Sequence, residues 1–161
     1  MNSINQNAEP DEQNEGNFIE NWEPEAWVYF IWLAVGDRVY LKVGRSVNPS
    51  SRLDQLLAGM PEEPFQAHHL ACLMEDQAIL FERIFHELLS PYRTRGEWFS
   101  HANVKHLYAI LYEKLEELLT LFYTFGYKPY FETIPLKGDH PMLHQNGFLD
   151  YISSRAGSDK E

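Results

Sequence analysis

Residues 28–43, VYFIWLAVGDRVYLKV, decide the fold of this 161-residue chain. Two runs of β-branched and aromatic residues, 28–35 and 39–43, flank a short turn that contains Gly36. This pattern is typical of an antiparallel hairpin. The apolar stretch 26–35 is too short to cross a bilayer, because a membrane-spanning helix takes roughly 20 residues. The sequence therefore predicts two paired, buried strands and no membrane partner.

A helix and a third strand are expected after the hairpin. Asn48 and Pro49 fit the N-cap and the first position of a helix that ends near Gly59. The apolar run 67–73 predicts the third strand. The order so far is strand, strand, helix, strand.

Two amphipathic helices complete the pattern. Asp76 is expected to cap the first, which runs to about residue 89, and apolar residues recur at helical spacing over 104–122. The apolar stripe of the first helix comprises Phe81, Ile84, Phe85 and Leu88. We therefore expect an α+β fold with a small three-stranded antiparallel sheet flanked by helices and a helical and irregular C-terminal extension.

Composition divides the chain into four segments. Residues 1–25 hold seven acidic residues and no Lys or Arg, and their low apolar content predicts a disordered tail. Residues 26–101 carry the strands and helices of one domain. Residues 102–126 are expected to form a long amphipathic helix that packs on this domain. Residues 127–161 form an extension whose role the sequence does not assign.

The charge distribution bears on possible partners. A formal net charge of −11 argues, for the whole chain, against non-specific binding to nucleic acid. Residues 26–101, however, hold nine acidic and seven basic residues, so the charge does not exclude nucleic-acid binding by the folded part. The single cysteine, Cys72, excludes an intramolecular disulfide and fits a reducing compartment. A cytoplasmic location is therefore expected.

Four polar residues stand out against this framework. Tyr29 lies within the first strand, Lys42 late in the second, Arg52 early in the first helix and Glu82 on the second helix. Taken singly, each fits an ordinary role as a strand residue or a surface charge. Taken together they form an ordered set, because residues 42–46 read KVGRS and Arg52 follows Lys42 by ten residues.

These motifs resemble those of the GIY-YIG nuclease superfamily, in the branch typified by a phage T5 open-reading-frame domain, where the second motif begins with Lys. The first motif here reads WVY at 27–29 and lacks the Gly and Ile of the family pattern. The resemblance covers roughly residues 27–101. It implies a GIY-YIG-like fold and an endonuclease that hydrolyses DNA, with RNA as an alternative substrate.

The resemblance also implies a role for each site residue. Tyr29, Lys42, Arg52, Glu82 and His86 are the expected catalytic residues. Glu82 is expected to bind one Mg²⁺ or Mn²⁺ ion, mainly together with substrate. Tyr29 would orient or deprotonate the attacking water, and Lys42 would stabilise the phenolate or serve as the base itself. Arg52 suits a non-bridging phosphate oxygen. His86 lies one helical turn beyond Glu82, where it could shuttle a proton or contact phosphate, and an ordinary histidine at the edge of the helix fits the same position.

Three further arginines are expected to contact nucleic acid. Arg45, Arg93 and Arg95 are assigned to phosphates of the DNA backbone. The segment 96–99, GEWF, is interpreted as apolar packing through Trp98 and Phe99.

Two other functions compete with cleavage. The first is a nucleic-acid-binding module that keeps the fold without turnover. The second is a protein-interaction unit whose helix over 104–122 docks a partner and whose acidic tail mimics DNA. Metal-dependent cleavage, salt-dependent binding without cleavage, and absence of nucleic-acid affinity distinguish the three.

Overall fold

The structure, a computed structural model, describes residues 17–136. The elements in chain order are β1 (Ala26–Val35), β2 (Arg38–Ser46), α1 (Pro49–Ala58), β3 (Gln66–Cys72), α2 (Glu75–Leu88), the 3₁₀ helix η1 (Ser90–Tyr92), β4 (Arg93–Arg95), β5 (Trp98–His101), α3 (Val104–Thr124) and β6 (Phe131–Pro135). Within residues 17–136, no helix is long and apolar enough to cross a membrane.

The strands form one antiparallel sheet in the order β4-β5-β2-β1-β3-β6. The α+β class is confirmed, but the expected sheet of three strands is wrong, because the sheet has six strands within residues 17–136. The predicted hairpin and third strand form its centre, and β4, β5 and β6 extend it at both edges. These added strands have only three to five residues, too few to show the alternation that marks a strand in sequence.

The β1–β2 hairpin is the one that the opening stretch predicts. Its register runs from Trp27 opposite Ser46 to Val35 opposite Arg38. Gly36 adopts φ +60° in the turn, a left-handed conformation that glycine reaches without steric cost. The hairpin thus fixes which residues of β2 share a face with Tyr29 of β1.

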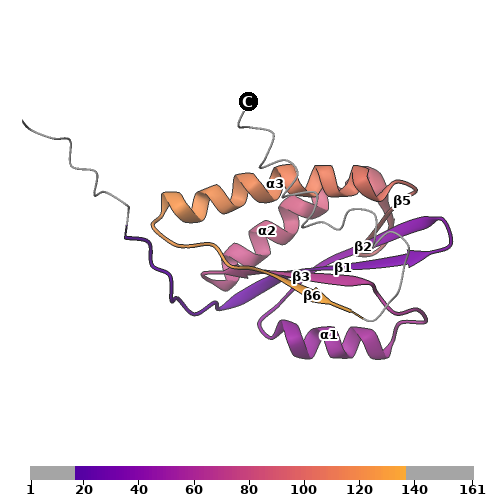
Figure 1. The fold of residues 1–161 in the computed structure, drawn as a ribbon, viewed down its shortest axis with the longest axis horizontal. Helices are drawn as coiled ribbons and strands as arrows, with labels where there is room; N and C mark the ends of the chain where they lie inside the picture. The colour runs from indigo at the N-terminus through magenta and orange to yellow at the C-terminus, as the bar shows by residue number, and fades with distance from the viewer. Residues whose placement is uncertain (1–16, 137–161) are drawn as a thin grey trace, which may run out of the picture.

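Helices cover both faces of the sheet (Figure 1). Helices α2 and α3 pack on one face over the main core, where Phe30 meets Phe85 edge to face at 4.9 Å between ring centroids. Helix α1 covers the other face, where Leu53 packs with Tyr29, Ile31 and Ala67 in a smaller cluster. The two faces meet different helices, so a site that needs residues from both must lie at an edge of the sheet.

The helix starts agree with the sequence in one case and differ in another. The Asn48 side chain accepts a hydrogen bond from the Ser51 amide at 3.1 Å, so the predicted cap of α1 is confirmed. Asp76 does not cap α2; the cap position is Met74, whose side chain makes no capping hydrogen bond. Asp76 lies in the first turn instead, where a carboxylate interacts favourably with the helix dipole.

Residues on either side of the predicted domain pack against it. Residues 17–25 belong to the segment expected as a disordered tail. The Trp22 ring nevertheless stacks on Phe122 of α3, with 5.8 Å between the ring centroids. Its Nε1 donates a hydrogen bond to the Lys128 carbonyl at 2.8 Å. The Ile19 amide donates to the Gly126 carbonyl at 2.8 Å. Residues 1–16 and 137–161 lie outside the described part, and the segment boundaries at 25, 101 and 126 stay predictions.

Acid is expected to destabilise the fold through His68 on β3. Its buried ring stacks on Phe131 of β6, and Nδ1 lies 3.1 Å from the Thr133 hydroxyl. Burial, with a smaller contribution from His69, lowers the pKa of His68 to about 3. An unfolded histidine has a pKa of about 6.5, so unfolding takes up a proton at any pH between these values. The free energy of unfolding should therefore fall by up to about 1.4 kcal/mol for each pH unit below 6.5.

Urea unfolding of wild type and His68→Leu at pH 7 and pH 5 measures this dependence. The variant should lose less stability than wild type between the two pH values, because it has no proton to take up at this position. An equal loss in both proteins would exclude His68 as a source of acid sensitivity.

Candidate active site

The site forms where β5 ends and the edge of β2 is left open. Strand β5 pairs with β2 only as far as Lys42 opposite Trp98. One residue further, the Val43 amide donates to the Glu97 carbonyl at 3.3 Å. The Val43 carbonyl accepts from Nε2 of His86 on α2 at 2.8 Å. The end of a short strand thus lets a helix side chain reach the backbone of β2.

Glu82 lies one turn before His86 on α2 and pairs with Arg45 of β2. Its Oε2 is 3.0 Å from Arg45 Nε, and its side chain is 17% exposed. Burial raises the pKa of Glu82, the charges of Arg45, His86 and Lys42 lower it, and Glu97 raises it. The net direction is upward, so desolvation outweighs the attraction of the nearby cations.

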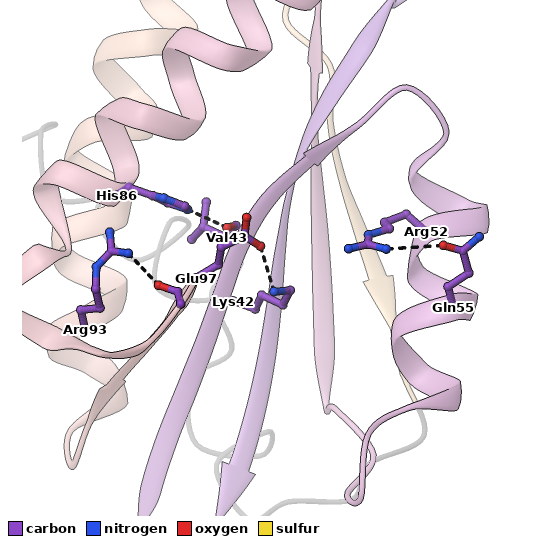
Figure 2. Close-up of polar contacts among 8 residues, drawn as sticks. Lys42, Val43, Arg52, Gln55, His86, Arg93 and Glu97 are labelled. Atoms are coloured by element: carbon purple, nitrogen blue, oxygen red, sulfur yellow. Dashed lines mark hydrogen bonds and ion pairs between the residues drawn. The ribbon is translucent and has the colours of Figure 1, made fainter.

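Lys42 lies on the α1 face of the sheet, and its side chain extends to the open edge of β2. By strand alternation it shares a face with Tyr29, because it lies opposite Ile31 of β1. Its ammonium reaches the edge, where Nζ lies 2.9 Å from Glu97 Oε2 (Figure 2). Nζ also lies 5.5 Å from the centroid of the Trp98 ring. The ammonium therefore points toward Glu97, and the expected contact with the Tyr29 phenol stays a prediction.

An open cavity of about 500 Å³ lies beside this edge. Its lining includes Glu82, His86 and Glu87 from α2, Arg93 from β4 and Glu97 from the β4–β5 turn. Both signs of charge line the cavity, which suits a polar ligand that carries charge. The structure thus brings Glu82, His86 and Arg93 together, and Arg45 joins them through its ion pair with Glu82.

Tyr29 lies on the α1 face of the sheet, next to Gly44. A Cβ atom at position 44 would overlap the ring and hydroxyl of Tyr29. The glycine of the KVG motif is therefore required for a close approach of the phenol to β2. Arg52 projects from the exposed side of α1, where its Nη1 lies 3.5 Å from Gln55 Oε1. Figure 2 shows Arg52 and His86 on opposite sides of the strands.

Comparison with known proteins gives one match. The family model for the T5orf172 domain matches residues 26–119, which is more than half of the chain. The chain belongs to the T5orf172 domain family. This confirms the resemblance drawn from the motifs and makes the chain a GIY-YIG-like, nuclease-type domain. No curated protein and no solved structure matches it.

Glu97 is one of three charged residues in the cavity lining of this T5orf172 domain that the sequence interpretation missed, with Arg83 and Glu87. The segment GEWF was assigned to packing, and Phe99 is indeed fully buried. Glu97, however, lines the cavity and pairs with Lys42. The signal available in sequence was an acidic residue directly before a short aromatic strand, which carries information only once the partner strand is known.

The two distal arginines differ in their surroundings. Arg93 donates from Nη1 to the Gly96 carbonyl at 2.6 Å and lies 5.2 Å from the centroid of the Phe99 ring, so its guanidinium is held at the cavity wall. Arg95 is exposed on β4. Of these two arginines of the T5orf172 domain, Arg93 lines the cavity and Arg95 does not, so Arg95 can act only on a ligand that extends beyond the cavity.

The residues at the cavity fit a weakly held divalent cation. Within residues 17–136, no group of three or more His, Cys, Asp or Glu side chains is placed to hold a metal ion. Mg²⁺ is commonly bound by one or two carboxylates, with waters and substrate phosphates as the remaining ligands. Glu82 offers such a carboxylate, partly desolvated and beside the cavity. The donor set therefore suits a cation that a phosphate ligand helps to bind.

Proposed function

We propose that this T5orf172 domain is a divalent-metal-dependent endonuclease that hydrolyses phosphodiester bonds of DNA. The observation that carries the proposal is that Glu82, His86 and Glu97 line one cavity at the open edge of β2, where Arg45 pairs with Glu82 and Lys42 pairs with Glu97. Family membership supports the same class of reaction.

The basic residues would bind and polarise the scissile phosphate. Hydrolysis forms a bond from a water oxygen to phosphorus and breaks one P–O ester bond, while negative charge grows on the phosphate oxygens. Arg93 lines the cavity and Arg45 pairs with Glu82 of its lining, and both guanidinium groups can donate charge-assisted hydrogen bonds to those oxygens. Arg52 projects from α1 on the other side of β2 and would contact the DNA backbone there.

We assign proton uptake from the attacking water to His86, and the oxygen that leaves phosphorus takes its proton from solvent. Because the Val43 carbonyl can only accept, Nε2 of His86 carries a proton in this hydrogen bond. In the neutral ring, Nδ1 then holds the lone pair that can take a proton from water. Tyr29, on the α1 face, would orient water through its hydroxyl from that side of β2. A Mg²⁺ or Mn²⁺ ion on Glu82 would supply positive charge to the phosphate and make water more acidic.

Supercoiled plasmid provides the test. Purified protein should convert it to nicked circles in Mg²⁺ or Mn²⁺ and leave it intact in EDTA. Matched reactions with single-stranded DNA and RNA define the substrate. Intact plasmid under every divalent ion, with the protein shown to be folded by circular dichroism, would overturn the proposal.

One observation favours a second candidate, a nucleic-acid-binding module without turnover. Arg45 and Lys42, which pair with two acidic residues of the cavity lining, are already neutralised by those carboxylates, and such ion pairs can serve the stability of the fold alone. In that case DNA binding should weaken steeply with salt, survive Glu82→Gln unchanged, and lead to no cleavage.

A further inference from the structure

We propose that Glu97 is a positioning residue that holds Lys42 at the open edge of β2 as a cation, so that Lys42 acts on the phosphate by its charge and not as the base. The inference rests on the proposed function. It gives Lys42 a role other than the two expected from the resemblance, which were to stabilise the Tyr29 phenolate or to serve as the base.

The β4–β5 hairpin turn places Glu97 beside Lys42. Arg95 pairs with Trp98, so Gly96 and Glu97 form the turn, and Gly96 adopts φ +58°. The register of β5 then sets Trp98 opposite Lys42. The Glu97 carbonyl accepts from the Val43 amide, which fixes the backbone of Glu97 to β2 at the point where the ladder ends. Glu97 is thus held in place by main-chain contacts that do not involve its carboxylate.

The surroundings of Lys42 pair its ammonium with a carboxylate. The side chain is 11% exposed, and its Nζ lies 2.9 Å from Glu97 Oε2. Burying a charge is costly unless the charge is paired, and Glu97 supplies the partner. The Trp98 ring, 5.5 Å from Nζ, adds a second contact that only the cation makes. Glu97 and Trp98 therefore act together on the ammonium.

A paired ammonium remains useful to a phosphate. It has three N–H donors and no lone pair, so it can keep one hydrogen bond to Glu97 and direct another at a phosphate or leaving oxygen. The same lack of a lone pair prevents it from accepting a proton. His86 then remains the base on the α2 side, and Lys42 stabilises the negative charge that develops in the transition state.

A double-mutant cycle on DNA cleavage tests this role. Lys42→Met should lower kcat roughly 100-fold, the usual cost of removing one transition-state donor. Glu97→Gln, nearly isosteric, should lower kcat about 10-fold or more while KM changes less, because the lost interaction acts through Lys42. The double variant should be within about threefold of Lys42→Met, since residues that act as one unit are not additive. Glu97→Asp should restore part of the loss, and the exposed Glu113→Gln on α3 is the control.

Two outcomes would overturn the inference. If the losses of the two single variants multiply in the double variant, Glu97 acts independently of Lys42. If Glu97→Gln lowers the melting temperature but leaves kcat unchanged, its role is only structural. A wild-type protein that cuts nothing overturns the proposed function and the inference together, whereas multiplied losses in an active protein overturn the inference alone.

Discussion

The Glu82→Gln variant is expected to cut plasmid DNA about 10³-fold more slowly than wild type while it stays folded. Glutamine keeps the shape of the side chain but carries no charge, so it cannot hold a divalent cation beside the cavity. It also leaves Arg45 without the ion pair seen at 3.0 Å. Both changes remove charge from the place where the proposed reaction needs it.

The same substitution should not cost stability. Burial raises the pKa of Glu82, which means that the folded protein favours the neutral form more than the unfolded chain does. Between the ordinary pKa and the raised one, stability falls as pH rises, and above both it stays reduced by the buried charge. A neutral amide removes that cost, so the melting temperature of Glu82→Gln at pH 7 should equal or exceed that of wild type.

Initial nicking rates in Mn²⁺ and calorimetric melting curves measure the two effects. Glu113→Gln on α3 removes one glutamate charge far from the cavity and should match wild type in both. Cleavage by Glu82→Gln at more than a tenth of the wild-type rate would remove Glu82 from the proposed metal site.

The Gly44→Ala variant is expected to lose about 2–3 kcal/mol of unfolding free energy and most of its DNA cleavage. A methyl group at position 44 would occupy the place of the Tyr29 ring and hydroxyl. Either the ring rotates away or β1 and β2 separate, and a rigid sheet resists the second. The phenol would then leave the position from which it is proposed to orient water.

Gly59→Ala provides a matched control for this variant. Gly59 caps α1 at φ −100°, where alanine is allowed, and its added Cβ would meet only the Leu56 carbonyl at 3.8 Å. We expect it to change stability by less than about 0.5 kcal/mol. Tyr29→Phe separates the two effects of Gly44→Ala, because it keeps the ring and removes the hydroxyl. A Gly44→Ala protein with wild-type stability and activity would contradict the required close approach.

The centre of the fold could be predicted from sequence because its signals are local. The hairpin depends on two apolar runs and a glycine turn. The start of α1 depends on Asn48, which accepts the capping hydrogen bond from Ser51 three residues on, and on Pro49 at the first helical position. The packing stripe of α2 follows from helical spacing, and Phe81 and Phe85 are buried as that spacing requires.

The remaining elements depend on contacts between distant residues. Strand β6 pairs with β3, from which it is separated by some 60 residues of sequence. Its five residues are too few to show a pattern that predicts a strand. Trp22 lies in an acidic segment whose composition conceals the aromatic contact with Phe122. The composition of a segment is an average over all its residues, whereas the packing of residues 17–25 on α3 depends on the single side chain of Trp22.

The site shows the same division. Spacing along α2 placed Glu82 and His86 on one side of that helix, and both line one cavity. The pairing of Lys42 with Glu97 depends on where β5 ends, which the sequence did not show. The catalytic and DNA-contact roles of the predicted residues stay predictions that the variants above test.

The open edge of β2 also has a consequence for solubility. An exposed strand edge with free amides and carbonyls can recruit a strand from another molecule and start aggregation. Here the Val43 amide is hydrogen-bonded to the Glu97 carbonyl, and the Val43 carbonyl to the His86 ring. Two residues further along β2, the Arg45–Glu82 ion pair adds charge. The residues proposed for catalysis therefore also prevent the open edge of β2 from pairing with a strand of another copy of the protein. Substitutions at His86 are consequently expected to increase self-association as well as to slow cleavage.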